Sequence, residues 1–116
     1  MNEIKDLKKF EAYLSKKKHK EKLKYQSKTT YVLFNKEYNA YKIGSSTKTT
    51  QRIDILCKKH SNTKLVLTIP KNIEILLHRK FASKIEKINN EREWFRLNKY
   101  DLDYLKQLSV NYYENH

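Results

Sequence analysis

The chain has 116 residues, which is enough for one domain and too few for two of ordinary size. Its 26 Lys and Arg outnumber 13 Asp and Glu, and the resulting net charge of +13 excludes an acidic solvating protein and indicates a polyanionic partner. The single cysteine, Cys57, excludes an intramolecular disulfide framework and a multi-cysteine zinc site. No apolar run approaches the roughly 20 residues of a membrane span, and the N-terminus lacks the apolar stretch of a secretory signal, so we expect an intracellular protein with no membrane partner.

Residues 1–28 carry a net charge of +6 and predict a basic amphipathic helix or arm. The apolar residues Ile4, Leu7, Phe10 and Leu14 recur every three or four positions, as on one face of a helix. This helix could pack on the domain or lie as a basic arm along nucleic-acid phosphates. A membrane-surface helix is disfavoured because the apolar stripe is short. The lysines expected to contact phosphates here are Lys16, Lys17, Lys18 and Lys20.

Residues 29–44 predict a β-hairpin whose two strands surround a turn-like stretch over 35–39. A register in which paired residue numbers sum to 73 places Tyr31 opposite Lys42 on one face of the sheet. A slip of two residues keeps these side chains on the same face, whereas a slip of one would bring Tyr41 there instead. A lysine ammonium near a tyrosine lowers the pKa of the phenol, so Tyr31 could accept a proton. Ordinary strand packing is the alternative.

The rest of the chain alternates between helical and extended patterns. We expect helices over about 49–60, 72–87 and 98–109, extended segments over 65–69 and 93–97, and a frayed tail over 111–116. Asn98 is the expected N-cap of the last helix. The apolar residues expected to face inward are Ile53, Leu56 and Cys57, then Leu77, Phe81, Ile85 and Ile88, then Leu102, Leu105 and Leu108.

Gly44 and Arg52 are the candidate phosphate-binding residues between the hairpin and the first of these helices. Gly44, the only glycine, is expected to end the second strand, where it could provide a positive φ or a close backbone approach to a phosphate. Arg52 follows eight residues later and could hold a phosphate through its bidentate fork, although a solvated helix charge is the common alternative. Lysines with the same expected role are Lys48, Lys58 and Lys59.

Glu74 and His78 lie four residues apart and therefore on one face of the helix predicted over 72–87. An acid at the boundary of an apolar stripe, near positive sites, suggests a magnesium ligand. An acid that interacts with the helix dipole is the alternative. Zinc is disfavoured because the HExxH spacing is absent, and because Cys57 and His60 are too few to complete a site.

Taken together, these residues resemble the GIY-YIG nuclease superfamily, most closely the branch from phages and large DNA viruses. The resemblance covers about residues 29–108. The matching segments are Tyr31, Tyr41-Lys42-Ile43-Gly44, Arg52, Glu74, Leu77-His78-Arg79-Lys80-Phe81 and Glu93-Trp94-Phe95. The first motif departs from the family because no Gly-Ile precedes Tyr31, and Lys42 stands where many members have the second tyrosine.

The resemblance implies an α/β (α+β) domain over residues 29–110, with a three-stranded antiparallel sheet flanked by helices. It implies hydrolysis of DNA phosphodiesters with one Mg²⁺ or Mn²⁺ ion. Tyr31 would activate the attacking water, Lys42 would help to keep Tyr31 deprotonated, Arg52 would neutralise charge on the phosphorane, and Glu74 would bind the metal. Secondary candidates are Tyr41, Gly44, His78 and Glu93.

Three alternatives remain open at this stage: a metal-dependent DNA endonuclease, a non-cutting nucleic-acid-binding module on the same fold, and an RNA-directed nuclease. The preference for DNA comes from the resemblance alone. Because the chain has no room for a separate sequence-reading domain, we expect sequence specificity to be low, or to come from residues 1–28 or from a partner. The expected location is the cytoplasm, or the nucleus or viral replication site of a host.

Overall fold

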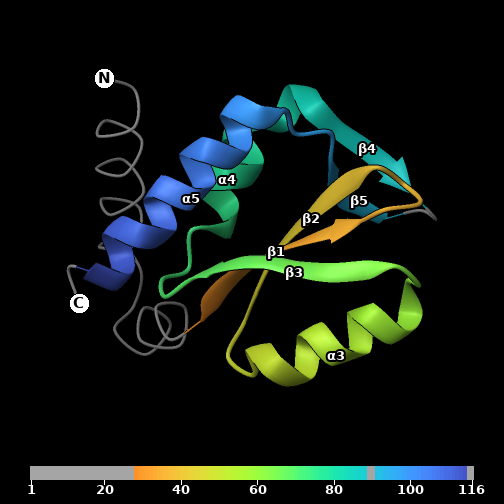
Figure 1. Cartoon of the computed structure of the whole chain (residues 1–116), viewed down its shortest axis with the longest axis horizontal. Helices are drawn as coiled ribbons and strands as arrows, with labels where there is room; N and C mark the ends of the chain where they lie inside the picture. The colour runs from red at the N-terminus through yellow and green to blue at the C-terminus, as the bar shows by residue number, and fades with distance from the viewer. Residues whose placement is uncertain (1–27, 89–90, 115–116) are drawn as a thin grey trace.

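The structure, a computed structural model, describes residues 28–88 and 91–114, with residues 91–93 described by their backbone alone (Figure 1). The basic helix or arm expected over 1–28, with Lys16, Lys17, Lys18 and Lys20, therefore lies outside the described residues except for Lys28. Among the described residues, no helix is long and apolar enough to cross a membrane.

The described chain forms one antiparallel sheet with helices on both faces. The strands are β1 Thr29–Asn35, β2 Ala40–Ser46, β3 Thr63–Ile69, β4 Ile85–Ile88 and β5 Glu91–Phe95, and their order in the sheet is β3-β1-β2-β5-β4. The helices are α3 Thr49–Lys59, α4 Glu74–Lys80 and α5 Lys99–Glu114, with a 3₁₀ turn over Ala82–Lys84. The α+β class is confirmed, but the expectation of three strands is wrong, because the sheet has five.

Of the two additional strands, β5 overlaps the segment predicted to be extended, whereas β4 comes mostly from a segment predicted to be helical. The helix expected over 72–87 ends at Lys80, and Ile85–Ile88 forms β4, which pairs with β5. Ile85, expected to face inward, is 45% exposed. The three-residue spacing of Ile85 and Ile88 is compatible with one face of a helix and also with the two ends of a four-residue strand. The segment forms a strand because it pairs with β5, and such tertiary contacts override a weak local preference for helix.

The β1–β2 hairpin positions the candidate residues. Its paired residue numbers sum to 75 rather than 73, so Tyr31 lies opposite Gly44 and Leu33 opposite Lys42. This is a slip of two residues, and Tyr31 and Lys42 therefore share one face of the sheet, as the alternation of side chains requires. The second strand does not end at Gly44 but continues to Ser46, leaving only a short connection to α3.

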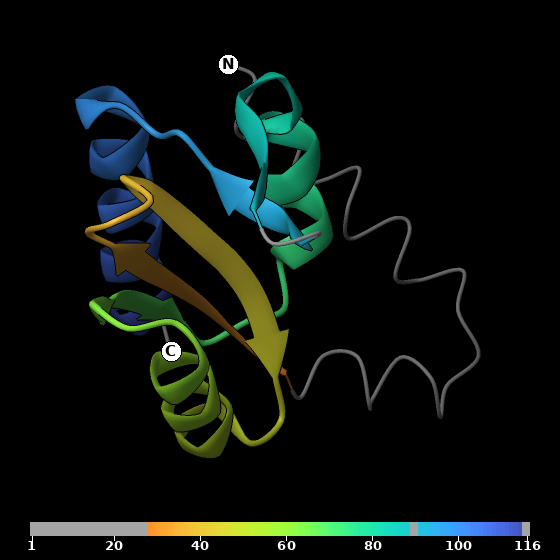
Figure 2. The same ribbon diagram turned by 90° about the vertical axis from the view of Figure 1, so that its right-hand side faces the viewer.

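Different helices cover the two faces of the sheet (Figures 1 and 2), and each face carries its own core. On one face, α3 packs against Tyr31 and Leu33 through Leu56, with Ile53 at its side. On the other face, α4 and α5 cover the larger core. Its buried members are Val32, Ile43, Ile69, Ile73, Leu76, Leu77, Phe81, Phe95, Leu105 and Leu108. The inward orientation expected for Leu56, Leu77, Phe81, Leu105 and Leu108 is confirmed.

Helix α5 begins as the sequence predicts and ends later. The Asn98 side chain accepts a hydrogen bond from Asp101 N at 2.9 Å, and the Asp101 carboxylate accepts one from Asn98 N at 2.9 Å, which is a reciprocal N-terminal cap. The frayed tail expected from residue 111 is wrong as far as Glu114, where α5 ends. Long-range contacts order this end, because Ser109 Oγ donates to the Thr68 carbonyl and the Tyr113 and Thr68 hydroxyls are hydrogen-bonded.

Candidate active site

Tyr31 lies across the backbone of Gly44, its partner on β2. A Cβ atom at position 44 would stand 2.3 Å from the Tyr31 hydroxyl oxygen and 2.5 Å from Cζ, so only glycine leaves room for the phenol. Gly44 has no positive φ. The close backbone approach that the sequence suggested therefore exists, and the group that approaches is the Tyr31 ring. The side chain is 2% exposed, so the phenol presents very little of its surface to solvent.

Lys42 lies on the same face of β2, two residues before Gly44. Its side chain is also 2% exposed, and its Nζ lies 5.2 Å from the centre of the Trp94 ring. Because Tyr31 pairs with Gly44 and Leu33 pairs with Lys42, Tyr31 and Lys42 are diagonal neighbours across β1 and β2. Diagonal neighbours on one face are within reach of long side chains, which puts a cation on the side of the sheet that carries the phenol.

Glu74 begins α4 and is held by Ser45 of β2. The Ser45 hydroxyl donates a hydrogen bond of 2.6 Å to Glu74 Oε1 across 29 residues of sequence. The main chain around α4 is fixed by Thr30, whose hydroxyl donates to the Lys71 carbonyl and accepts from Ile73 N at 2.9 Å. Glu74 is therefore a partly exposed carboxylate with a fixed orientation beside β2.

His78 lies one turn after Glu74 and contacts the same strand. Its Nε2 donates to the Ile43 carbonyl at 2.8 Å and lies 3.7 Å from Glu74 Oε2. Strand β5 pairs with β2 at Tyr41 and Lys42, and at the next residue His78 takes the place of a strand partner. His78 thereby attaches α4 to β2 at the point where the candidate residues gather.

Three consecutive residues of β2 thus contact candidate residues from two other elements, β1 and α4. Ile43 contacts His78, Gly44 contacts Tyr31, and Ser45 contacts Glu74. Because consecutive side chains alternate, Tyr31 and Glu74 reach β2 from opposite faces, and they are separated at Gly44 by backbone without a side chain. Figure 2 shows the C-terminal half of β2 passing α4 before the chain turns into α3.

The carboxylate of Glu74 has the chemistry of a magnesium ligand. The described residues contain no group of three or more His, Cys, Asp or Glu that could hold a metal together. A single carboxylate fits Mg²⁺, which keeps several water ligands and is commonly bound by one or two carboxylates together with substrate phosphate.

Arg52 and the three predicted lysines of this region are exposed on or beside α3. Lys48, Arg52 and Lys59 are four and seven residues apart, so they line one side of the helix. Lys58 is exposed in the last turn as well. The structure places Arg52 on the helix that directly follows β2, and chain connection, rather than a described contact, relates it to the other candidates.

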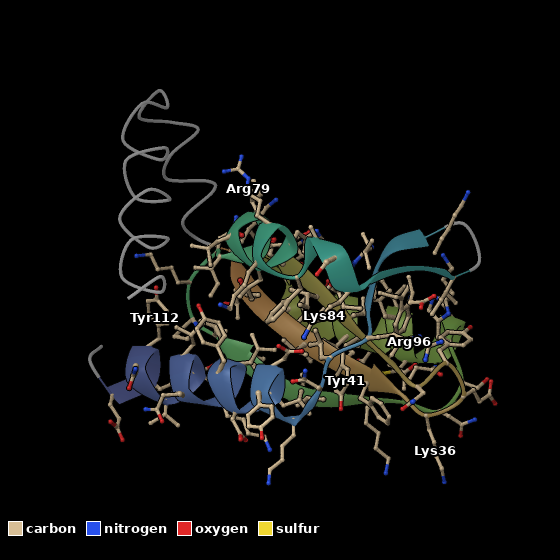
Figure 3. The ribbon with its side chains drawn as sticks, turned by 90° about the horizontal axis from the view of Figure 1, so that it is seen from above. Lys36, Tyr41, Arg79, Lys84, Arg96 and Tyr112 are labelled. Atoms are coloured by element: carbon tan, nitrogen blue, oxygen red, sulfur yellow. The ribbon has the colours of Figure 1, made fainter. Side chains whose placement is uncertain are left out.

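The secondary candidate Tyr41 does not join this group. Tyr41 points to the opposite face from Lys42, where its ring lies 4.7 Å from that of Phe34 (Figure 3). Burial raises the pKa of the Tyr41 phenol above its usual value. The Glu93 side chain lies outside the described residues, although its backbone belongs to β5.

Ser45 and Trp94 contact the candidate residues, although neither was itself a candidate. Trp94 belongs to the Glu93-Trp94-Phe95 segment that matches the family, without an expected role. The only signal for Ser45 was its position next to Gly44. Its partner Glu74 lies in a different element, which no local pattern identifies.

The described residues form an α+β domain in which helices flank an antiparallel sheet, and Tyr31 and Glu74 approach β2 next to Gly44 from opposite faces. The chain belongs to the T5orf172 domain family, which matches residues 28–109. This is a phage-associated domain of the GIY-YIG or nuclease-like fold type, and membership favours a nuclease-like or DNA-binding module. Searches of curated proteins and of solved structures found no match.

Proposed function

We propose that this protein is a metal-dependent DNA endonuclease that hydrolyses phosphodiester bonds at residues 43–45 of β2. The observation that carries the proposal is the contact of these three consecutive residues with His78, Tyr31 and Glu74. A phosphodiester bound beside Gly44 would have the Tyr31 hydroxyl on one face of β2 and Glu74 on the other, with only the Gly44 backbone between them.

Tyr31 and Lys42 would supply the base. Tyr31 is the residue that would take a proton from the attacking water, and Lys42 on the same face would stabilise the resulting phenolate. The Tyr31 ring cannot move toward β2, since its hydroxyl end already lies against the backbone of Gly44. A base fixed in this way needs little reorganisation when the phosphate arrives, which favours reaction over mere binding.

Glu74 is the residue that would hold Mg²⁺ or Mn²⁺. When bound, the ion would supply charge stabilisation for the leaving oxygen of the phosphodiester. Ser45 and His78 contact the two carboxylate oxygens of Glu74 and so restrict its orientation. This arrangement matches the general pattern in which hydrogen bonds to a ligand improve metal binding.

The cations of α3 would bind the DNA backbone. Lys48, Arg52 and Lys59 line one side of the helix, and 11 residues of helix extend about 16 Å. That length covers several phosphates of one strand. Arg52, nearest to β2 along the helix after Lys48, is the residue that would neutralise charge developing on the scissile phosphate.

The test is plasmid cleavage with and without Mg²⁺ by the wild-type protein and by Glu74→Gln. We expect cleavage that requires the metal and falls at least about 100-fold in Glu74→Gln, the size of effect that follows loss of one transition-state contact. Glu114→Gln, at the exposed end of α5, is the matched control and should cleave normally. Full cleavage by Glu74→Gln would overturn the proposed metal site.

A second candidate is a non-cutting nucleic-acid-binding module. The observation that favours it is the near-complete burial of Tyr31 and Lys42, each 2% exposed, which restricts access of water to the base. The same assay separates the two functions, because a binding module would bind the plasmid but would not cleave it in the presence of any divalent metal ion. A parallel reaction with RNA of the same sequence as substrate tests the third possible function, an RNA-directed nuclease.

A further inference from the structure

Lys42 carries its charge into the interior, where one of the groups near its ammonium is an indole ring. Trp94 is fully buried and lies directly opposite Lys42 in the β2–β5 pairing. The Lys42 Nζ lies 5.2 Å from the centre of the Trp94 ring. Burial of a charge is costly unless nearby groups stabilise it, and the electron-rich face of tryptophan is the best aromatic partner for a cation.

Trp94 is itself fixed by two other aromatic side chains. The Tyr38 ring stands edge-on to it with centroids 5.3 Å apart, and the His60 ring does so at 5.2 Å. Tyr38 and His60 also meet edge-on, and the Tyr38 hydroxyl is hydrogen-bonded to His60 Nδ1 at 3.1 Å. Edge-on pairs at these distances have the favourable geometry for aromatic rings. We call these three residues the aromatic cluster.

The aromatic cluster joins three segments that are distant in sequence. Tyr38 comes from the turn between β1 and β2, His60 follows the last residue of α3, and Trp94 belongs to β5. His60 N also donates to the Leu56 carbonyl and so completes the last turn of α3. The cluster therefore fixes the indole above Lys42 and the C-terminal end of the helix that carries Arg52.

We propose that the aromatic cluster is a positioning device for the Lys42 ammonium, in which the Trp94 face holds the charge and Tyr38 and His60 hold the indole. The catalytic consequence rests on the proposed nuclease function, in which Lys42 stabilises the Tyr31 phenolate. Trp94 is a positioning residue in this proposal, because it acts through Lys42. A purely packing role would accept any apolar side chain of similar volume, whereas a charge-holding role requires an aromatic face.

The first experiment measures the position of Lys42 directly. In the wild-type protein, the ε-methylene protons of Lys42 should show an upfield ring-current shift, with the signal assigned by its loss in Lys42→Arg. Trp94→Leu should move this signal to the usual lysine position. Phe95→Leu is the control, because Phe95 is equally buried in β5 but faces the other core. An unshifted Lys42 signal in the wild type, or one unchanged in Trp94→Leu, overturns the proposal.

The second experiment measures single-turnover DNA cleavage and DNA affinity in the same variants. Trp94→Leu should lower the cleavage rate about tenfold while the Kd for DNA stays within about twofold, and Trp94→Phe should recover part of the loss because it restores an aromatic face. Equal rates in Trp94→Leu and wild type would overturn the proposal. If the wild type cleaves no DNA, the nuclease function fails, and the ring-current measurement still decides the position of Lys42.

Tyr38→Phe provides a variant that removes one hydrogen bond and keeps all three rings. This variant should fold, since Tyr38 is only partly buried. It should move the Lys42 signal toward the usual lysine position and lower the cleavage rate, each by less than Trp94→Leu does. Thermal melting of each variant checks folding. A folded Tyr38→Phe in which the cleavage rate falls while the Lys42 signal stays in place would overturn the proposed route through Trp94.

Discussion

Tyr31 and Gly44 face each other across β1 and β2, and the phenol occupies the space in which any other residue at position 44 would place its Cβ. The only glycine of the chain is therefore required for space and not for an unusual φ. An aromatic side chain laid over a facing glycine is a known way to stabilise a strand pair at such a residue. Here the same contact lays the Tyr31 phenol over Gly44, whose neighbours in the chain, Ile43 and Ser45, contact His78 and Glu74.

Gly44→Ala should destabilise the fold by about 1–3 kcal/mol, the usual cost of forcing an extra carbon into a filled space. Urea unfolding measures this cost from the shift of the midpoint. The same substitution in a Tyr31→Leu background should cost much less, because the ring that causes the clash is gone. An equal cost in both backgrounds would show that the Tyr31 ring is not the obstacle.

Ser45→Ala should raise the Mg²⁺ concentration needed for half-maximal cleavage by about tenfold or more, because the Glu74 carboxylate loses the hydroxyl that orients it. The cleavage rate at saturating Mg²⁺ should change less. Ser46→Ala is the matched control, since Ser46 Oγ accepts a hydrogen bond from Lys48 N and has no described contact with Glu74. The measurement is cleavage rate against MgCl₂ concentration, and identical curves for Ser45→Ala and wild type would refute this role.

Lys59→Ala should reduce the slope of log affinity against log salt concentration for duplex DNA by about 1, because one phosphate contact is lost. Lys48→Ala should do the same. The control is Lys106→Ala on α5, which covers the opposite face of the sheet from α3 and should leave the slope unchanged (Figure 1). Fluorescence anisotropy at several salt concentrations gives the slopes. A loss of slope in Lys106→Ala equal to that in Lys59→Ala would place the DNA elsewhere.

Arg79 is an exposed cation next to His78, and its substitution tests whether α4 also contacts the DNA. Figure 3 shows its side chain projecting away from the ribbon. If DNA crosses β2 at Gly44, the strand leaves the site on the α4 side, and Arg79→Ala should weaken DNA binding without changing the Mg²⁺ requirement. A changed Mg²⁺ requirement with unchanged DNA affinity would contradict this path for the strand.

Cys57 should react slowly with iodoacetamide in the folded protein. Burial first, and then the nearby Asp54 carboxylate, raise the pKa of the thiol above its ordinary value of 9.0, so less of the reactive thiolate is present at pH 8. Asp54→Asn should speed the reaction. Since folding favours the neutral thiol, its contribution reduces stability as the pH rises above the thiol pKa of the unfolded chain. Equal alkylation rates in folded and urea-unfolded protein would contradict the shift.

The sequence alone determined the features that depend on local patterns. The alternation of side chains in the β1–β2 hairpin placed Tyr31 and Lys42 on one face, and a register error of two residues left that conclusion intact because the pattern repeats every two residues. The capping residue Asn98 and the buried Leu105 and Leu108 fixed the start and inward face of α5 for the same reason: both signals come from neighbours within a few turns.

Only the tertiary structure decided which distant segments meet. Ile85–Ile88 became a strand because β5 was available to pair with it, and the end of α5 was ordered by Thr68, some 40 residues earlier. The Ser45–Glu74 hydrogen bond and the indole above Lys42 likewise join residues of different elements. Such contacts depend on how the elements pack in three dimensions. Because their two residues are far apart in the sequence, no periodic pattern within one segment predicts them.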